Sequence, residues 1–350
     1  MQNMTKKKVM LAVGGSGGHL LPAQQLGALL EGKVDVLLAG HGLSKNSFVT
    51  KEARICDIDA GAWGKGKYFQ FLYRSCKGVI QALFLLKKFS PDVVVGFGSY
   101  HTFPVLAAAF LLRKKIILFE ANCILGKVNR LFLPAAHTLA TQFVQKTEIS
   151  KAALVPALPW VQWEKKTPSK KEASLYFGLD SKKTTILVFG GSQGASFLNE
   201  RLPRVMAYFK DVQVIHFTGK GGHAVYGNPS CVKEFEPRMD FAYAAADVVV
   251  CRSGAGTVAE LIYYRKPALL IPFPFAMENH QLENGRFLAH KVQGALLLEQ
   301  REATLEKIEE KLKNLLQEIP EKQSALERLH IEKRTNFADL ILGTLNSQEV

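Results

Sequence analysis

The sequence predicts an α/β protein made of two Rossmann-like domains, each built on a parallel sheet. Short apolar runs rich in β-branched residues alternate with longer segments of helical spacing, as in parallel sheets that are covered on both faces. Two such runs, residues 9–13 and 186–189, are each followed by Gly-Gly-Ser, another glycine and a helix, so the unit occurs twice. A chain of 350 residues is also long for one hydrophobic core and of ordinary length for two domains.

The first half is predicted to contain four parallel strands whose carboxyl ends form a polar rim. The strands are expected at residues 9–13, 34–39, 91–96 and 115–119, with a helix at 19–32 after the first. Because the carboxyl ends of parallel strands meet at one edge of a sheet, the polar residues that follow them should lie together. These are Gly15, Ser16, Gly17, Gly18 and His19 after the first strand, His41 after the second, Ser99, Tyr100 and His101 after the third, and Glu120 and Asn122 after the fourth.

The second half contains a segment, residues 247–285, that is typical of a ligand site. A strand (248–251), a glycine turn (253–256), a helix (257–264) and a second strand (268–272) follow one another. Backbone N–H groups at the start of this helix should favour an anion, and a glutamate one turn on could accept hydrogen bonds from hydroxyls. An anion beside a diol indicates a nucleotide phosphate beside its ribose. The residues concerned are Gly254, Ala255, Gly256, Thr257 and Glu260.

Packing alone also places glycine turns between strands and helices, but the polar residues His280, Gln281 and Asn284 after the next strand favour a ligand site here. Neither glycine loop, at 14–18 or 190–194, matches the full dinucleotide motif, and neither contains the Gly-Lys-Ser/Thr of a P-loop. No acidic residue ends the strand after the first loop. The sequence therefore argues against NAD and against ATP hydrolysis.

The net charge of +14 is concentrated in the first half of the chain. Residues 1–160 carry 20 Lys and Arg against 8 Asp and Glu, whereas residues 161–350 carry 25 against 23. A basic first half indicates an anionic partner, either nucleic acid or an anionic membrane surface. The five cysteines are scattered without CxxC spacing, which argues against zinc and against a disulfide framework and fits a reducing cytoplasm.

One stretch, residues 65–89, interleaves aromatic and aliphatic residues with lysine and arginine. An apolar face with a basic border is how an interfacial helix lies in the headgroup region of an anionic bilayer. The membrane interpretation applies to Tyr68, Phe69, Phe71, Leu72 and Tyr73, whereas Val79, Leu83 and Leu86 are expected to pack on the sheet. RNA is the competing partner, but no RNA-binding module accompanies the charge, so we expect no nucleic acid. The apolar runs at 9–13 and 103–112 are too short for a signal peptide or a bilayer span.

The proline-rich segment 156–168 is predicted to join the two domains. We place the first domain at 1–158, a linker at 159–168 and the second domain at 169–329, and expect the C-terminal residues 330–350 to complete the first domain. A helix at 304–319 should end at Pro320, and a last helix is expected at about 322–345. The first of these helices carries an apolar face of Leu305, Ile308, Leu312, Leu315, Leu316 and Ile319.

Six segments in this order resemble the MurG family: GGSGGHLLPA, PDVVVGFGSY, FEAN, GGSQGA, ADVVVCRSGAGTVAE and ENHQLENG. This resemblance covers nearly the whole chain. It implies the two-domain GT-B fold and transfer of N-acetylglucosamine from UDP-N-acetylglucosamine to lipid I, which gives lipid II in peptidoglycan synthesis. It also implies a peripheral enzyme at the cytoplasmic face of the inner membrane, with lipid I and cell-wall synthesis proteins as partners and with no obligatory metal or cofactor.

The resemblance implies a role for individual residues. In the second domain the donor is expected to contact Ser192, Gln193, Phe235, Glu236, Met239, Ala255, Gly256, Thr257, Glu260, His280, Gln281 and Asn284. In the first domain the acceptor is expected to contact the glycine loop with Gly15, Ser16, Gly17 and Gly18, and also His19, Tyr100, Glu120 and Asn122.

The chain departs from the family pattern at two places. Leu158-Pro159-Trp160-Val161 stands where the family has Asn-Pro-x-Arg, so the phosphate-facing arginine is absent, and Gly256 stands where the family usually has leucine. Helix N-termini, or Lys165 or Lys166, would have to compensate for the arginine. Loss of one hydrogen bond from a charged group costs about 1.5–3 kcal/mol, so we expect weaker donor binding in an active enzyme.

The reaction requires a base for the acceptor hydroxyl. His19 at a helix N-terminus is our candidate, because the positive end of the dipole disfavours the imidazolium. Glu120 is the alternative base, and His19 could instead hydrogen-bond the acceptor phosphate. Direct displacement would invert the anomeric centre. The alternatives to this activity are another GT-B glycolipid transferase, a sugar-nucleotide epimerase, and a non-catalytic sugar-nucleotide-binding membrane scaffold.

Overall fold

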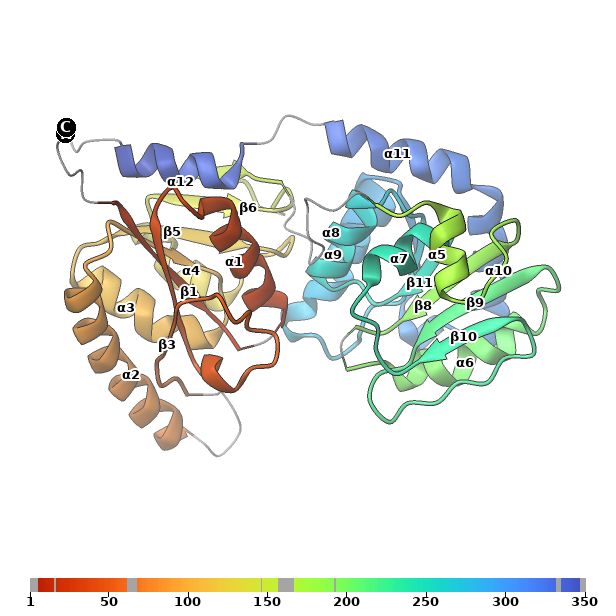
Figure 1. The fold of residues 1–350 in the computed structure, drawn as a ribbon, viewed down its shortest axis with the longest axis horizontal. Helices are drawn as coiled ribbons and strands as arrows, with labels where there is room; N and C mark the ends of the chain where they lie inside the picture. The colour runs from red at the N-terminus through yellow and green to blue at the C-terminus, as the bar shows by residue number, and fades with distance from the viewer. Residues whose placement is uncertain are drawn as a thin grey trace. The chain divides into compact units, whose positions relative to one another are not determined.

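In the computed structural model the described residues are 6–15, 17–61, 68–145, 147–156, 167–191, 193–331 and 335–346. They form two compact units, Met1–Trp160 with Lys333–Val350 (unit 1) and Val161–Glu332 (unit 2). Each unit is a parallel sheet with helices on both faces (Figure 1). The predicted fold class, two Rossmann-like parallel α/β units, is confirmed.

Unit 1 is built on a seven-stranded parallel sheet in the order β3-β2-β1-β4-β5-β6-β7. Its strand order reverses between β1 and β4, and ligands bind outside the carboxyl ends of the strands at such a reversal. The predicted strands are present, and β3, β6 and β7 are additional short ones. The strands are β1 (Lys8–Val13), β2 (Asp35–Gly40), β3 (Ile55–Asp57), β4 (Val93–Gly96), β5 (Lys115–Glu120), β6 (Thr138–Thr141) and β7 (Ala152–Leu154).

Two layers of helices cover this sheet. The helices are α1 (Gly17–Leu30), α2 (Tyr68–Phe89), α3 (Phe103–Leu111), α4 (Lys127–Phe132) and α12 (Phe337–Asn346). Side chains at alternate positions of β1, such as Met10 and Ala12, join the buried cluster under α2 and α3. Helix α12 lies beside α1 (Figure 1), and its Phe337 ring stacks on Phe119 with ring centroids 5.4 Å apart. The end of the chain thus supplies part of the core of unit 1.

The predicted helix at 322–345 is wrong, because two helices occupy this region. Helix α11 (Ile319–Ile331) belongs to unit 2, and α12 begins at Phe337. The Asn336 Oδ1 atom accepts hydrogen bonds from the N–H groups of Ala338 (2.9 Å) and Asp339 (3.3 Å), which starts a new helix. Helix α10 (Leu305–Gln317) does end before Pro320, and this proline lies in the first turn of α11, where it is tolerated.

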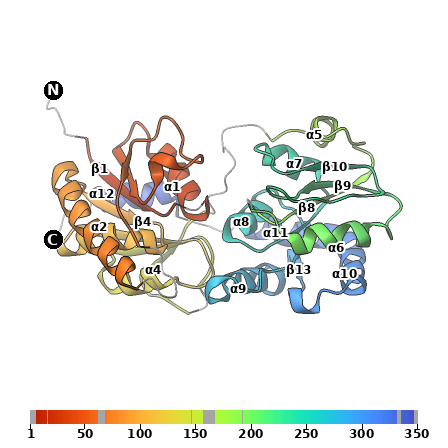
Figure 2. The ribbon, with the colours of Figure 1, turned by 90° about the horizontal axis from the view of Figure 1, so that it is seen from below.

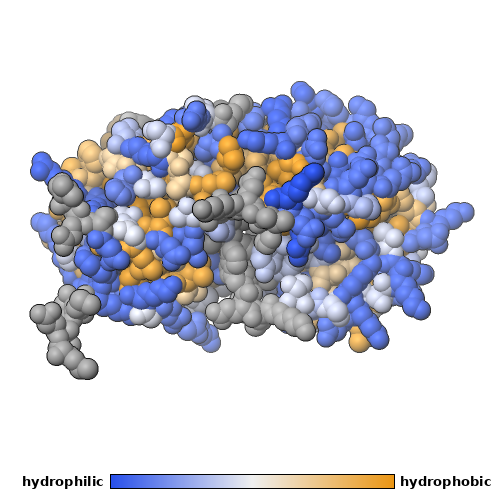
Figure 3. All heavy atoms as spheres, turned by 90° about the horizontal axis from the view of Figure 1, so that it is seen from above, coloured by the Kyte–Doolittle hydropathy of each residue, from blue (hydrophilic) through white to orange (hydrophobic). Residues whose placement is uncertain are grey.

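Unit 2 has a six-stranded parallel sheet in the order β10-β9-β8-β11-β12-β13. Helices α6 and α10 lie side by side on one face (Figure 2) over a shared apolar cluster. The outward-facing surface in the region of α11 is mostly hydrophilic (Figure 3). The strands are β8 (Thr184–Phe189), β9 (Val212–Phe217), β10 (Ser230–Lys233), β11 (Val248–Cys251), β12 (Ala268–Leu270) and β13 (Ala295–Leu297), and the remaining helices are α5 (Lys170–Tyr176), α6 (Ser196–Met206), α7 (Met239–Ala245), α8 (Ala255–Tyr263) and α9 (His280–Arg286).

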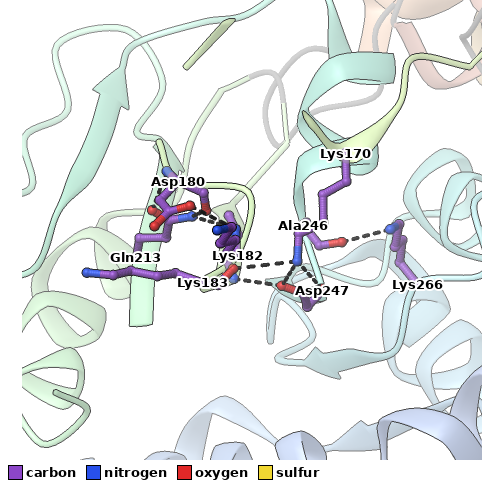
Figure 4. A network of polar contacts seen from close by, with 9 residues as sticks. Lys170, Asp180, Lys182, Lys183, Gln213, Ala246, Asp247 and Lys266 are labelled. Carbon is purple, nitrogen blue, oxygen red and sulfur yellow. Dashed lines mark hydrogen bonds and ion pairs between the residues drawn. The ribbon is translucent and has the colours of Figure 1, made fainter. Parts of the chain in front are cut away.

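Polar contacts close the amino-terminal edge of this sheet (Figure 4). The Asp247 carboxylate accepts from Lys170 Nζ at 2.7 and 2.8 Å and from the Thr185 N–H at 2.8 Å. Lys266 Nζ donates to the Ala246 carbonyl at 2.7 Å, and burial lowers the pKa of this lysine to about 8. Side chains at this edge are engaged with one another, and the opposite, carboxyl-terminal edge carries the loops that were predicted to bind a ligand.

A buried chain of hydrogen bonds runs through β9. The His216 ring is fully buried, with Nδ1 2.7 Å from the Tyr226 hydroxyl and Nε2 3.0 Å from Asn199 Oδ1. Asn199 Nδ2 in turn donates to the Thr218 carbonyl at 3.0 Å. Because Asn199 presents its oxygen to the ring, Nε2 carries the proton and Nδ1 accepts from Tyr226. This network fixes the turn that follows β9.

Acidification is expected to destabilise unit 2 through His216. Burial lowers the pKa of His216 to about 4, against about 6.5 in an unfolded chain. Between these values the unfolded chain binds a proton that the folded chain does not, so stability falls as the pH drops from 6.5 to 4, by about 3 kcal/mol in total. Hydrogen exchange of the β9 amides at pH 7 and pH 4.5 measures this loss. A His216→Gln variant should be less stable at pH 7 but show a flatter pH dependence, and an unchanged pH dependence would contradict the assignment.

Candidate functional site

The first group of predicted site residues lies at the carboxyl edge of the unit 1 sheet, in the loops after β1, β2, β4 and β5 (the unit 1 rim). His19 is the third residue of α1, as expected from the glycine loop before it. Its Nδ1–H donates to the Phe97 carbonyl at 2.7 Å, so the basic lone pair of the neutral ring is on Nε2. Gly98, whose φ of +72° favours glycine, lies beside this ring, and a Cβ there would be in ordinary van der Waals contact with His19 Cε1 at 3.6 Å. His19 is thus held as a single tautomer.

Glu120 occupies a different environment, because its carboxylate already accepts four hydrogen bonds. The donors are the N–H groups of Asn122 (3.0 Å) and Gly126 (2.9 Å) and the side-chain amides of Asn122 (3.1 Å) and Asn129 (2.9 Å). An ionised carboxylate has about four acceptor positions. Glu120 is also 5% exposed. This geometry favours a role in shaping the turn after β5 over that of a base.

The other predicted residues of the unit 1 rim surround these two. Gly15 accepts at its carbonyl from Asn46 Nδ2 at 2.6 Å, and Gly17 and Gly18 form the first turn of α1. Tyr100 begins a short 3₁₀ helix (Tyr100–Thr102) after Ser99, whose φ of 74° turns the chain at the end of β4. Ser16 lies outside the described residues. Two further histidines, His41 and His101, lie at the same rim with ring centroids 5.4 Å apart.

The second group lies at the carboxyl edge of the unit 2 sheet, in the loops after β8, β10, β11 and β12 (the unit 2 rim). Gly254 caps α8 in an extended conformation, and Ala255, Gly256 and Thr257 form its first turn. Orphan N–H groups and the helix dipole make this terminus favourable for an anion. Glu260 is 9% exposed, and its carboxylate accepts from the buried Tyr243 hydroxyl at 2.7 Å. The helix starts two residues earlier than predicted.

The loops after β11 and β12 are joined by hydrogen bonds. Ser253 Oγ–H donates to the Gln281 carbonyl at 2.7 Å, and the Ser253 carbonyl accepts from Asn284 Nδ2 at 3.2 Å. Asn284 is fully buried, so in this structure it supports the loop from behind. The His280 Nδ1–H donates to the Met277 carbonyl at 2.7 Å.

The backbone is strained just before α9. Glu278 and Asn279 both have positive φ, 51° and 54°. Consecutive non-glycine residues in this conformation store strain that is typical of functional sites. They turn the chain so that His280 and Gln281 start α9 at the unit 2 rim.

Arg252 is a residue of this rim that the sequence analysis did not single out. It is 7% exposed, and its guanidinium donates to the carbonyls of Ile271 (2.9 Å) and Pro272 (3.1 Å) and to Gln300 Oε1 (2.6 Å). No carboxylate among the described residues pairs with it. Burial lowers its pKa to about 10, so it keeps its charge at neutral pH. A buried cation therefore lies two residues before the N-cap of α8.

The loop after β10 and the glycine loop after β8 complete the unit 2 rim. Phe235 is 56% exposed, whereas Glu236 is buried and paired with Lys233 at 2.7 Å. Met239 begins α7. Gln193 is exposed in the glycine loop, and the next residue, Gly194, packs against the Thr218 carbonyl so closely that a Cβ would clash with it. Ser192 lies outside the described residues.

Exposed apolar residues form a stripe along α2, which we call the α2 stripe: Phe69, Leu72, Tyr73, Ile80 and Phe84. Basic residues border it, among them Arg74, Lys77, Lys87 and Lys88. Leu86 is buried in the cluster over the sheet and Leu83 packs against it, as predicted, whereas Val79 is half-buried. Phe71 is half-buried against Gly61 and turns away from the stripe. Ile80 and Phe84 were not predicted to belong to this surface, although the spacing 69, 72, 73, 76, 80, 84 is helical. The Tyr68 side chain is outside the described set.

Two further properties bear on the chemistry. No helix in the described ranges is both long enough and apolar enough to span a bilayer. Within the same ranges, no group of three His, Cys, Asp or Glu residues is arranged to hold a metal ion.

Two family models match the chain, one for each unit. Residues 9–141 match the glycosyltransferase family 28 N-terminal domain and residues 185–341 match the glycosyltransferase family 28 C-terminal domain. The UDP-N-acetylglucosamine–N-acetylmuramyl-(pentapeptide) pyrophosphoryl-undecaprenol N-acetylglucosamine transferase of Protochlamydia amoebophila is 34% identical over 97% of this chain and 96% of its own length. The protein of the same name from Chlamydia pneumoniae is 32% identical over 87% of this chain and 88% of its own.

Solved structures show the same fold. The crystal structure of Acinetobacter baumannii MurG superposes with a TM-score of 0.77 at 24% identity and covers 97% of this chain and 99% of its own. The kitacinnamycin glycosyltransferase superposes with a TM-score of 0.76 at 16% identity, over 97% and 99% of the two chains. At these identities the likeness shows the fold alone, and it confirms the GT-B architecture.

Proposed function

The chain belongs to the MurG family within glycosyltransferase family 28, and from this premise we propose how its two rims carry out the transfer. The enzyme is a hexosyltransferase that moves N-acetylglucosamine from UDP-N-acetylglucosamine to lipid I and gives lipid II for peptidoglycan synthesis. The observation that carries this assignment is identity of 34% to a curated relative of that name over 97% of the chain. The muramyl C4 hydroxyl is the proposed nucleophile, and the reaction inverts the anomeric centre.

The unit 2 rim is proposed to bind the donor. The N-terminus of α8 receives the diphosphate, Glu260 accepts from the ribose hydroxyls, and Phe235 and Met239 border the uracil. Arg252 supplies the positive charge that the absent Asn-Pro-x-Arg arginine would otherwise provide, since its charge has no carboxylate partner in the described part of the chain. His280 and Gln281 are placed near the sugar. The proposal includes no obligatory metal or cofactor.

Replacing Glu260 by alanine is expected to raise the KM for UDP-N-acetylglucosamine roughly tenfold or more, because a hydrogen bond to a charged group is lost. The kcat should change much less, since the ribose is remote from the reacting bond. Tyr243→Phe, which removes the hydroxyl that orients Glu260 at 2.7 Å, should have a smaller effect in the same direction. Steady-state kinetics measure both. Glu327→Gln on exposed α11 is the control, and an unaltered donor KM in Glu260→Ala would refute the ribose contact.

The unit 1 rim is proposed to bind the acceptor, with His19 as the general base. Its Nδ1–H is held by the Phe97 carbonyl, so the neutral ring presents Nε2 as the proton acceptor. Tyr100, Asn122 and the glycine loop are proposed to line the acceptor site. As lipid I is anchored in the bilayer, we further propose that the enzyme is peripheral at the cytoplasmic face of the inner membrane and that the α2 stripe contacts anionic lipid. Proteins of cell-wall synthesis are proposed partners.

Polar substitutions in the α2 stripe are expected to weaken vesicle binding. Ile80→Ser with Phe84→Ser removes two side chains that are 56% and 71% exposed. Their burial in lipid contributes a few kcal/mol, so binding to phosphatidylglycerol vesicles should fall about tenfold or more. Tyr208→Ser with Val225→Ser, which alters two exposed apolar residues of unit 2, is the matched control. If vesicle sedimentation gives equal binding for both double variants, the α2 stripe is not the surface that contacts lipid.

The decisive test of the function is an assay of the purified chain with lipid I in detergent. Lipid II should form from UDP-N-acetylglucosamine and not from other UDP-sugars. Transfer of a different sugar would indicate another glycolipid transferase, and conversion of the sugar nucleotide without lipid I would indicate an epimerase. Donor binding without any turnover would indicate a non-catalytic scaffold. Each of these three results would overturn the proposal.

A further inference from the structure

Three histidines from three loops gather at the unit 1 rim. His19 follows β1, His41 follows β2 and His101 follows β4. The His41 and His101 rings are tilted by 30° with centroids 5.4 Å apart. Burial, then His41, then His19 lower the pKa of His101, so both other rings lie within electrostatic range of His101. Among the described residues, no hydrogen bond engages a ring nitrogen of His41 or His101.

The charges that face this pair are mostly positive. His101 is perturbed by His41 and His19, and no carboxylate contributes to its pKa shift. His41 also faces Asp59, but that carboxylate is bound to Lys77 at 2.5 Å and lies near Arg74, and these groups together lower its pKa. Asp57, on the same side, accepts from the Leu43 N–H at 2.6 Å. A partly buried pair of imidazoles among cations is a site that an anion would stabilise.

These groups form a continuous series from the α2 stripe to His19. Arg74 and Lys77 lie on α2, and both interact electrostatically with Asp59. Asp59 interacts in the same way with His41. His41 and His19 both interact electrostatically with His101. Gly78 allows α2 to pack directly on this series, because a Cβ there would clash with the Asp59 carbonyl. An acceptor whose lipid is in the membrane and whose sugar is at His19 must place its diphosphate between these two points.

We propose that His41 and His101 bind a phosphoryl group of the acceptor's diphosphate and take up a proton as it binds. This inference rests on the proposed function for the identity of the ligand. In the free protein, burial and the neighbouring His41 and His19 lower the pKa of His101, which disfavours the charged form of that ring. An anion that accepts a hydrogen bond from each ring offsets this effect and supplies the counter-charge, so acceptor affinity increases as the pH falls from 8 toward 6. His41 and His101 thereby add to acceptor binding and leave the base at His19.

The first experiment uses inorganic pyrophosphate and the full chain labelled with ¹⁵N-histidine. NMR titrations between pH 5 and pH 8.5, with and without pyrophosphate, report the pKa of each ring. Pyrophosphate should raise the pKa of His41 and His101 by about half a unit or more, as a nearby opposite charge favours the charged form. The ring of His137, which is exposed at the opposite edge of the same sheet, should not respond. Unaltered His41 and His101 titrations would overturn the inference.

The second experiment measures transfer by His41→Gln, His101→Gln and the double variant, with His137→Gln as the matched control. The KM for lipid I should rise roughly tenfold in the double variant, with kcat and the KM for UDP-N-acetylglucosamine within about twofold of wild type. The pH dependence of the lipid I KM between pH 6 and pH 8 should flatten. A lipid I KM that stays at the wild-type value would overturn the inference while the transferase assignment stands. A pyrophosphate response in a chain that makes no lipid II would support the anion site and overturn the proposed function instead.

Discussion

His19→Ala is expected to lower kcat about 10²–10⁴-fold, the range that one general base contributes. The substitution removes the ring whose Nδ1 lies 2.7 Å from the Phe97 carbonyl and whose Nε2 is the proposed proton acceptor. UDP binding should be preserved, because the proposed donor site is in unit 2. The acidic limb of the pH–rate profile should disappear along with the base.

The matched control is His137→Ala, an exposed histidine of the same unit that lies away from the rim. Isothermal titration with UDP checks that the donor site of each variant is intact. If His19→Ala binds UDP normally and turns over at the wild-type rate, His19 is not the base. If instead only the KM for lipid I rises, His19 binds the acceptor phosphate and the base lies elsewhere.

Gly194→Ala is expected to disable the proposed donor site. Its φ of +74° disfavours any residue with a Cβ, and the added carbon would clash with the Thr218 carbonyl and lie 2.8 Å from Gly219 Cα. Overpacking against backbone and positive-φ strain together cost about 3 kcal/mol or more. The glycine loop and the turn after β9 must then separate, so the KM for UDP-N-acetylglucosamine should increase together with a loss of stability.

Gly178→Ala separates strain from overpacking. Gly178 has a φ of +69°, but a Cβ there would meet nothing within 4 Å. This control should cost only about 1–2 kcal/mol, the penalty of the left-handed conformation. Urea unfolding compares the stabilities, and steady-state kinetics compare the donor KM values. Equal losses for the two variants would show that the close approach of Gly194 to Thr218 does not matter.

Local sequence patterns predicted the central strands well and the short edge strands poorly. The run that became β1 is apolar at every position because both of its faces are covered, and this signal is visible in the sequence alone. β3 and β7 have three residues each, which is too short for any periodicity to be read. The two C-terminal helices appeared as one because no proline or glycine interrupts residues 322–342, and the capping role of Asn336 depends on backbone geometry.

The candidate site residues were likewise predictable only where the local sequence carried a signal. The glycine loop before α1 and the turn before α8 were readable because strand, small-residue turn and helix follow one another in the sequence. The four hydrogen bonds to Glu120 were not readable, since two of the donors are Gly126, the N-cap of α4, and Asn129 within α4, and only the fold brings this helix back to the end of β5. Arg252 was not singled out, because nothing in the local sequence distinguishes it from other arginines. Its partners are the carbonyls of Ile271 and Pro272 just after β12, so the burial of Arg252 depends on a different strand from the one it follows.

The position of α12 separates the order of folding from the order of synthesis. Phe337, which stacks on Phe119 and lies near Phe97 in the core of unit 1, is translated after all of unit 2. While the ribosome makes residues 161–332, the face of the first sheet that α12 will cover has no partner helix there. Unit 2 can complete its own core first, and unit 1 closes only after α12 emerges. In a nascent chain stalled before Phe337, unit 2 should therefore resist protease more than unit 1 does.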